Sequence, residues 1–205
     1  MQPSVTGYNM KRYLLISPLL FSLILFSSIC AAMGPGKLIQ RVSGNPYELV
    51  DSNTTQSFTF PFSNDAGEQD AETQWTTSAA YSVRRVDVGL AKANSPTGTL
   101  SLMIFDDSAG SPGSLVATAS NTLDISTITT SCVYYTFYLP ATALSDATAY
   151  HIVLDSDTTN AAANTVDLCT GTNVGAGTTY SGVLSGTWTN GAVSSVYQGN
   201  FKTYE

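Results

Sequence analysis

The sequence predicts an all-β fold, a two-sheet antiparallel β-sandwich of jelly-roll type, preceded by an N-terminal signal helix. Short segments in which apolar and polar residues alternate recur after residue 33, and this alternation is the pattern of a half-buried strand. Gly, Pro, Asn and Asp, the residues that favour turns, separate these segments. No helical periodicity of useful length follows residue 33. Strands at this spacing are typical of a sandwich or jelly roll.

Residues 1–32 have the organisation of a signal peptide. Lys11 and Arg12 form a short positive region, the run from Tyr13 to Cys30 is mostly apolar, and small residues follow up to Ala32. Translation starting at Met10 would place the charged pair directly after the initiator. Two alternatives remain open: lipidation of Cys30, and retention of the apolar run as a membrane anchor. Cleavage after Ala32 would change the formal charge from −7 to −9, because it removes two basic residues and no acidic one.

The composition excludes one class of partner and indicates the compartment in which the protein works. Lys and Arg are few and scattered, so no basic stripe exists to follow a nucleic-acid backbone, and nucleic acid is excluded as a partner. After cleavage only Cys132 and Cys169 remain, and a single cysteine pair in an oxidising compartment usually forms a disulfide. Two separate buried thiols are the alternative. We therefore expect a secreted protein, extracellular or at the cell surface, that contacts the membrane only through an uncleaved leader.

Weak periodicity and several breakers between Gly34 and Gln56 predict that residues 33–72 are an extended lead-in to a sandwich domain at 73–205. Within the lead-in, residues 57–62 read Ser-Phe-Thr-Phe-Pro-Phe, a period-two pattern. Pro61 cannot donate to a ladder, so this strand is predicted at a sheet edge. Such a strand could also add to the sheet of a neighbouring subunit, which makes self-association an alternative role.

The segment from Tyr81 to Gly113 predicts a central hairpin. Two alternating strands flank a turn at Asn94–Gly98, and their apolar positions are Val86, Val88 and Leu90 in the first strand and Leu100, Leu102 and Ile104 in the second. The apolar phase shifts at Arg84–Arg85, and one extra residue there would make a β-bulge.

A further strand follows at Val133–Leu139. Its alternation places Val133, Tyr135, Phe137 and Leu139 toward the core and leaves Tyr134 and Tyr138 on the outward face.

The run from Thr73 to Ser120 contains a Gln-Trp-Thr start, a Pro-Thr-Gly turn, an apolar strand that ends near Asp and a Gly-Ser-Pro-Gly turn. The aromatic strand VYYTFYLP, the segment ALSDATAYHIVL and the late GTWTNG follow. Over Thr73–Tyr204 this order resembles bacterial surface domains of the choice-of-anchor R type, which have jelly-roll relatives among carbohydrate-binding modules and phage structural proteins. The resemblance implies a jelly-roll fold and a role at a cell surface.

No pattern of residues points to catalysis. The chain has one histidine, His151, placed on an alternating strand, and it has no Gly-x-Ser-x-Gly elbow. The glutamates Glu48, Glu68, Glu72 and Glu205 fall outside the expected core strands, and nothing indicates that two acids converge on one cleft. We therefore expect a protein that is not an enzyme.

Two aspartate-rich turns raise the question of calcium. Asp106–Asp107 and Asp155–Asp157 supply oxygen ligands of the kind that calcium prefers. Asp is also an ordinary residue for capping turns, and this reading is favoured, so no cofactor is predicted.

The predicted function is that of a secreted, non-catalytic binding or adhesion module, with an extracellular glycan or surface component as its partner. Sugar-binding sandwiches use exposed aromatic rings, and the candidate ligand contacts are Trp188, Tyr180, Trp75, Tyr134 and Tyr138. Trp188, between two glycines, could instead close one end of the core. The alternative function is structural: a subunit of a surface layer, fibre or phage-like appendage that assembles through edge strands.

Overall fold

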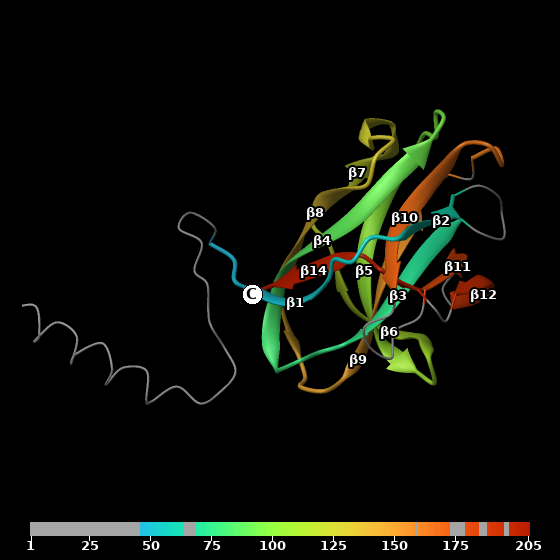
Figure 1. The fold of residues 1–205 in the computed structure, drawn as a ribbon. Coiled ribbons are helices and arrows are strands. Elements are labelled where there is room, and N and C mark those ends of the chain that lie inside the picture. Colours follow the sequence, from blue (N-terminus) through green and yellow to red (C-terminus); the bar gives the residue numbers. More distant parts are fainter. Residues whose placement is uncertain (1–45, 64–68, 159, 173–178, 185–187, 195–196) are drawn as a thin grey trace, which may run out of the picture. The chain divides into compact units, whose positions relative to one another are not determined.

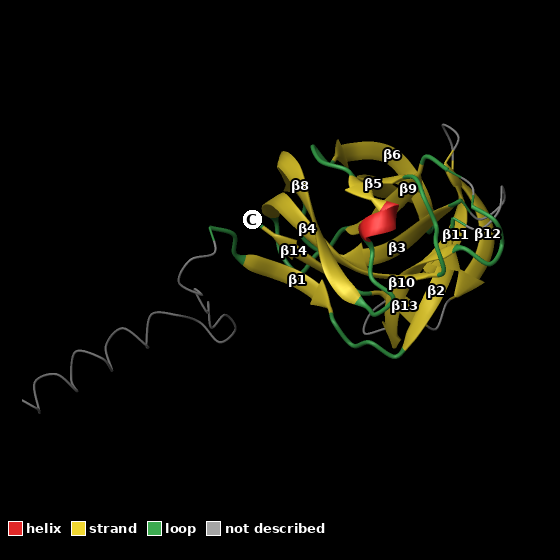
Figure 2. Cartoon of the chain, turned by 90° about the horizontal axis from the view of Figure 1, so that it is seen from above, coloured by secondary structure: helices red, strands yellow, loops and turns green. Residues whose placement is uncertain are grey.

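The computed structural model describes residues 46–63, 69–158, 160–172, 179–184, 188–194 and 197–205. These residues form two antiparallel sheets, and the single helical element among them is the 3-10 turn η1 (Ile125–Thr127) (Figures 1 and 2). The all-β prediction is therefore confirmed for this part of the chain. The predicted signal peptide, residues 1–32, lies outside the described residues. Within the described ranges, no helix has the length and apolar character needed to cross a bilayer.

Sheet A is organised around the long strand β4. Strand β8 pairs along one side of β4, and β14 and then β10 pair along the other (Figure 1). Its seven strands are β1 (Leu49–Asn53), β2 (Phe58–Phe62), β4 (Tyr81–Ala93), β8 (Val133–Leu144), β10 (Thr165–Thr172), β13 (Tyr197–Gly199) and β14 (Phe201–Tyr204).

Sheet B also has seven strands, in the order β12-β11-β3-β9-β5-β6, with β7 paired to the start of β5. Its strands are β3 (Asp70–Thr76), β5 (Thr99–Ser108), β6 (Ser111–Thr118), β7 (Leu123–Asp124), β9 (Ala149–Ser156), β11 (Thr179–Leu184) and β12 (Trp188–Ser194).

One hydrophobic core takes side chains from both sheets. The alternating residues that the sequence places inward on β4 and β5 are all fully buried in it. These residues are Val86, Val88, Leu90, Leu100, Leu102 and Ile104. Because both sheets bury an apolar face in the same core, the architecture is sandwich-like. At the start of β8, Val133 is 41% exposed, so the core-facing set of that strand begins only after it.

The central hairpin is a wrong prediction, because β4 and β5 belong to different sheets. Asn94 has φ of 58° and Gly98 has φ of 113°, both in the left-handed region, and the chain leaves sheet A and enters sheet B between them. The predicted bulge is confirmed, because the β4–β8 register shifts between Val83 and Arg85.

The predicted edge strand is confirmed. Among the described strands β2 pairs with β10 alone, and Pro61 lies opposite Asp167. The segment predicted as a lead-in nevertheless contributes β1 and β2 to sheet A, and β3 begins at Asp70. The compact unit accordingly runs from Gly44 to Glu205, and the predicted boundary near residue 72 falls inside a strand.

The predicted disulfide is present between Cys132 and Cys169 and joins the start of β8 to β10. Gly89 of β4 lies beside it: a Cβ at this position would stand 3.2 Å from the Cys169 Cβ and 3.1 Å from the Asn200 Cβ. A glycine here lets three chain segments approach closely. Disulfides persist in oxidising environments, so the bridge fits a compartment other than the cytoplasm.

Candidate functional site

The outer face of sheet A, which points away from the core, carries a patch of tyrosines and charged residues. It arises from strand alternation: Phe137 and Phe201 enter the core, and their neighbours on β8 and β14 point the other way. We call this patch the tyrosine face. It consists of Tyr47, Arg85, Asp87, Tyr134, Thr136, Tyr138, Lys202 and Tyr204.

The strand register aligns the tyrosine face in rungs that run across β14, β4 and β8. The rungs are Tyr204–Arg85–Tyr138, Lys202–Asp87–Thr136 and, on two strands, Gly89–Tyr134. Directly opposite residues on one face of an antiparallel sheet have neighbouring side chains, so each rung is a line of contacts. Because of the bulge in β4, the side chain of Arg85 points to the same face of the sheet as that of Asp87.

Asp87 lies at the centre of the face and is only 4% exposed. Arg85 donates to both of its carboxylate oxygens, from Nε at 2.8 Å and from Nη2 at 2.6 Å, and the Thr136 hydroxyl donates at 2.7 Å. The hydrogen bond from Arg85 to Asp87 raises the pKa of the Arg85 guanidinium above its ordinary value. A two-pronged ion pair of this kind fixes the plane of the arginine.

Cations and rings alternate around Asp87. The Arg85 guanidinium carbon lies 4.5 Å from the centre of the Tyr204 ring and 5.9 Å from that of Tyr47. The Lys202 ammonium lies 4.0 Å from the Tyr134 ring centre, within cation–π range. The Tyr47 and Tyr138 rings are 6.1 Å apart between centroids. Each ring therefore has a neighbour that restricts its orientation.

Two rings of the face remain open to solvent: Tyr134 is 38% exposed and Tyr138 is 44% exposed. Burial raises the pKa of Tyr134, and the Asp87 charge adds to this effect. Burial, again reinforced by Asp87, raises the pKa of Tyr204 to about 12. These phenols therefore stay protonated at neutral pH and can donate hydrogen bonds to a ligand.

The positive charges of the described residues gather on this side of the sheet. Residues 46–205 contain four Lys or Arg residues. Arg85 and Lys202 lie on the outer face of sheet A, and Arg84 is exposed at the β4 bulge beside Arg85. The fourth, Lys92, donates to the Ser126 carbonyl. A chain of formal charge −7 thus gathers three of these four cations beside the exposed tyrosines.

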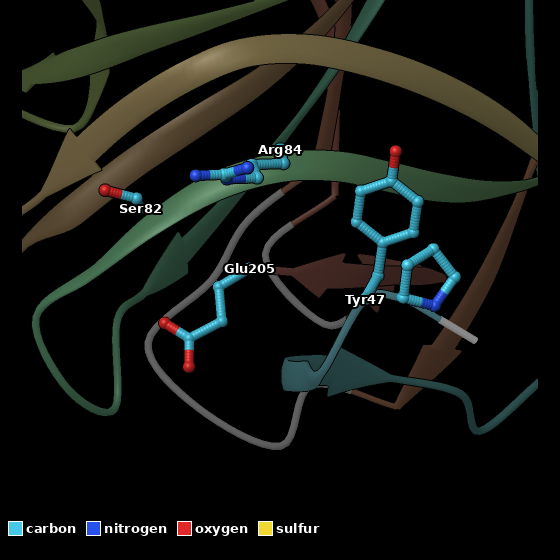
Figure 3. A pocket seen from close by; sticks show the side chains of 5 residues that line it. Tyr47, Ser82, Arg84 and Glu205 are labelled. Carbon is cyan, nitrogen blue, oxygen red and sulfur yellow. The ribbon is translucent and has the colours of Figure 1, made fainter. Parts of the chain in front are cut away.

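A hollow of about 400 Å³ adjoins the tyrosine face. Pro46, Tyr47, Ser82, Arg84 and Glu205 line it, and Figure 3 shows the last four of these side chains around the same space. Tyr47 belongs both to the hollow and to the tyrosine face, so the two are continuous.

Of the five ligand contacts that the sequence predicts, two lie on the tyrosine face, one is buried in the core, and two have side chains outside the described part of the structure. Tyr134 and Tyr138 face outward as predicted and share the tyrosine face. Trp75 does not belong to a surface: it is 2% exposed and packs 5.7 Å, between ring centroids, from both Tyr150 and Phe201. It faces inward from β3 in phase with Ala71, so it is a core ring and cannot contact an external ligand.

Trp188 and Tyr180 have backbones in β12 and β11, and their side chains lie outside the described part of the structure. Arg85, Lys202 and Tyr204 of the tyrosine face are not among the contacts that the sequence predicts. In β14 the alternation that starts at the buried Phe201 is a signal that Lys202 and Tyr204 point outward. Nothing in the sequence, however, predicts that this strand pairs with β4.

A second cluster, made of one histidine and two carboxylates, is buried on the face of sheet B that points away from the core. His151 of β9 is fully buried, with Nδ1 2.8 Å from Glu72 of β3 and Nε2 2.9 Å from Asp107 of β5. Gln74 donates to Asp107 at 2.7 Å. The expectation that Glu72 lies outside the core strands is therefore wrong, because Glu72 sits within β3 and is fully buried.

The environment of this cluster shifts its pKa values. Burial raises the pKa of Glu72 to about 7, against the hydrogen bond and charge of His151. Burial alone would lower the pKa of His151, but the hydrogen bonds and charges of Glu72 and Asp107 outweigh it and raise that pKa. Both His151 nitrogens are engaged by carboxylates, so the cluster ties β3, β9 and β5 together and leaves no ring nitrogen for a substrate.

The aspartate-rich turns are occupied by protein donors. Asp107 accepts from the Gly110 amide at 3.1 Å, and Asp157 accepts from the Thr99 amide at 2.7 Å. Asp106 accepts from the Ser114 amide. These carboxylates act as caps of turns. Within the described residues, no group of three or more His, Cys, Asp or Glu is placed to hold a metal ion.

In comparisons with known proteins, no family model and no curated protein sequence matches this chain.

Proposed function

We propose that the protein is a secreted, non-catalytic binding or adhesion module of jelly-roll type, and that it binds a carbohydrate on the tyrosine face. The observation that carries this proposal is the pair of solvent-open rings, Tyr134 and Tyr138, held beside buried and ion-paired polar groups. The apolar face of a sugar ring stacks on an aromatic ring, and its hydroxyls need fixed donors and acceptors nearby. The tyrosine face offers both.

The spacing of the two rings favours a chain of sugars over a single one. Tyr134 and Tyr138 are four residues apart on β8, which corresponds to about 13 Å along a strand. One sugar ring cannot contact both of them. The ligand class that fits is therefore an extended oligosaccharide or polysaccharide lying along β8.

The Cys132–Cys169 bridge supports the extracellular part of the proposal, because disulfides persist outside the reducing cytoplasm. A cell-surface or extracellular setting is also where a glycan-binding module meets its ligand. The leader that would direct the chain there is the predicted signal peptide at residues 1–32.

The test is a screen of the purified domain against neutral and acidic polysaccharides by affinity electrophoresis, followed by calorimetry on the polysaccharide that retards it. We expect Tyr134→Ala and Tyr138→Ala each to weaken binding by roughly tenfold, which corresponds to about 1.4 kcal/mol for the loss of a contact ring. Phe58→Ala is the matched control, because Phe58 is 52% exposed but lies on β2, away from the tyrosine face.

Retention of full affinity by both tyrosine variants, with a folded circular dichroism spectrum, would refute the tyrosine face as the site. Failure of the wild-type domain to bind any polysaccharide in the screen would refute the function itself.

The edge strand favours a second candidate, a structural subunit that assembles through β2. Phe58 and Pro61 are exposed on this strand, and β2 pairs only with β10 among the described strands. Pro61 weakens the case, because proline is one of the residues that blunt an edge against pairing. Sedimentation over a range of concentrations separates the two candidates. Assembly that Phe58→Glu abolishes would favour the structural role, and a monomer at every concentration would exclude it.

A further inference from the structure

The hollow beside Tyr47 is lined by a cationic side chain, Arg84, and a carboxylate side chain, Glu205, that form no ion pair with each other. Arg84 is exposed and has no ion pair or hydrogen bond with the described residues, whereas the adjacent Arg85 is held by Asp87. The Glu205 side chain lines the same space and forms no ion pair with Arg84 (Figure 3). An arginine and a carboxylate that share a hollow without pairing leave a strong donor and a strong acceptor open to a third group.

The walls of the hollow complete a mixed lining. The rings of Pro46 and Tyr47 supply apolar surface, and Ser82 supplies a hydroxyl. A volume of about 400 Å³ lies at the small end of the range for ligand sites. Tyr47 also lies 6.1 Å, between ring centroids, from Tyr138, so a ligand on the tyrosine face can extend into the hollow.

We infer that the hollow is a subsite for one neutral sugar residue of the bound glycan, with Arg84 donating to its hydroxyls and Glu205 accepting from them. Tyr47 and Pro46 cover the apolar side of that residue. This inference rests on the proposed function and adds the charge class of the ligand and the side chains that orient it.

Charge balance selects a neutral residue. A uronate or sulfated sugar would gain from Arg84, but it would place its anion beside Glu205 in a protein of charge −7. A cationic amino sugar would meet the opposite conflict with Arg84. A hydroxylated neutral ring meets neither, because each hydroxyl can both donate and accept.

The experiment compares binding of short neutral oligosaccharides (cello-, xylo-, manno- and galacto-series) with binding of oligogalacturonate by the wild-type domain, Arg84→Gln and Glu205→Gln. We expect the wild type to prefer a neutral series. Each variant should bind that series about tenfold more weakly, because a hydrogen bond to a charged group is lost. Glu205→Gln should also narrow the preference over oligogalacturonate. Lys92→Gln is the matched control, since Lys92 lies near the opposite end of β4 from Ser82 and Arg84.

Three results would overturn the inference. If Arg84→Gln and Glu205→Gln bind like the wild type while Tyr138→Ala loses affinity, the hollow is not a subsite, although the proposed function stands. Wild-type preference for oligogalacturonate would show that the ligand class is acidic. If the wild type binds none of these oligosaccharides or polysaccharides, the proposed function fails and the subsite fails with it.

Discussion

Asp87 is the side chain on which the arrangement of the tyrosine face depends. Its carboxylate holds Arg85 through two hydrogen bonds and accepts a third from Thr136, although the residue is almost fully buried. The plane of Arg85 in turn orients Tyr204 and Tyr47. A single carboxylate thus organises the cation and the rings that we assign to glycan binding.

Asp87→Asn should lower the free energy of unfolding by about 2 kcal/mol, because the substitution keeps the size of the side chain but removes the charge that pairs with Arg85. Urea titration followed by fluorescence measures this change. Asp146→Asn, on an exposed turn, is the control and should leave the midpoint unchanged. Equal midpoints for the two variants would show that the Arg85–Asp87 pair contributes nothing to stability.

Removing the buried ring of Trp75 should cost more stability than removing the exposed ring of Tyr138. Trp75→Ala should cost about 3–5 kcal/mol, because it removes a buried ring that packs against Tyr150 and Phe201. Tyr138→Ala should cost less than about 1 kcal/mol, because that ring is 44% exposed. Chemical denaturation of both variants gives the comparison, and a larger loss for Tyr138 would contradict the assignment of core and surface.

At the scale of the elements, the Glu72–His151–Asp107 cluster joins three neighbouring strands through titratable groups. The pKa of Glu72 is raised from 4.5 to about 7 by burial, so the folded protein holds that proton more tightly than the unfolded chain. The pKa of His151 is raised above 6.5, which has the same sign. Both contributions are fully present below the unfolded pKa values and are lost as pH rises through the folded ones.

We therefore expect stability to fall as pH rises from about 4.5 to 7, by an amount on the order of 2 kcal/mol. The pKa of Asp107 is lowered from its ordinary value of 3.8, so its contribution to stability is lost as pH falls below that value. This opposite effect therefore lies outside the range from pH 4.5 to 7. Thermal melts between pH 4 and pH 8 test the prediction. The dependence should flatten in Glu72→Gln, and a wild-type melting temperature that rises with pH over this range would contradict the sign.

The disulfide is the other link between elements, and it closes a loop of 37 residues from the start of β8 to β10. Loop-closure entropy predicts that losing it lowers the free energy of unfolding by ~3–4 kcal/mol. Urea titration of the double variant Cys132→Ser/Cys169→Ser against the wild type measures the difference. If reductant lowers the stability of the wild type but not that of the double variant, the disulfide is the source of the difference. Equal stability of the two proteins without reductant would contradict the prediction.

At the scale of the whole molecule, alternation predicts which side of a strand a residue faces but not which strand lies beside it. The fully buried Val86, Val88 and Leu90 follow directly from their spacing, and Pro61 correctly marks an edge. The pairing of β4 with β5 fails because a turn at Asn94–Gly98 can join two sheets as readily as two neighbours. Pairing is decided by tertiary contacts, which local periodicity does not contain.

The candidate site shows the same limit. The outward direction of Tyr134 and Tyr138 is contained in the period of β8. Their neighbours Arg85 and Lys202 are not, because they arrive from strands far away in sequence. The burial of Glu72 is equally hidden, since its partner His151 lies 79 residues further along the chain.

The most direct test of the central claim is amide mapping by NMR while the domain is titrated with the oligosaccharide that it binds best. Amides of the tyrosine face on β4, β8 and β14 should shift with one common dissociation constant, and amides of sheet B should stay in place. Shifts confined to sheet B, or to the β2 edge, would contradict the assignment of the outer face of sheet A as the glycan-binding surface.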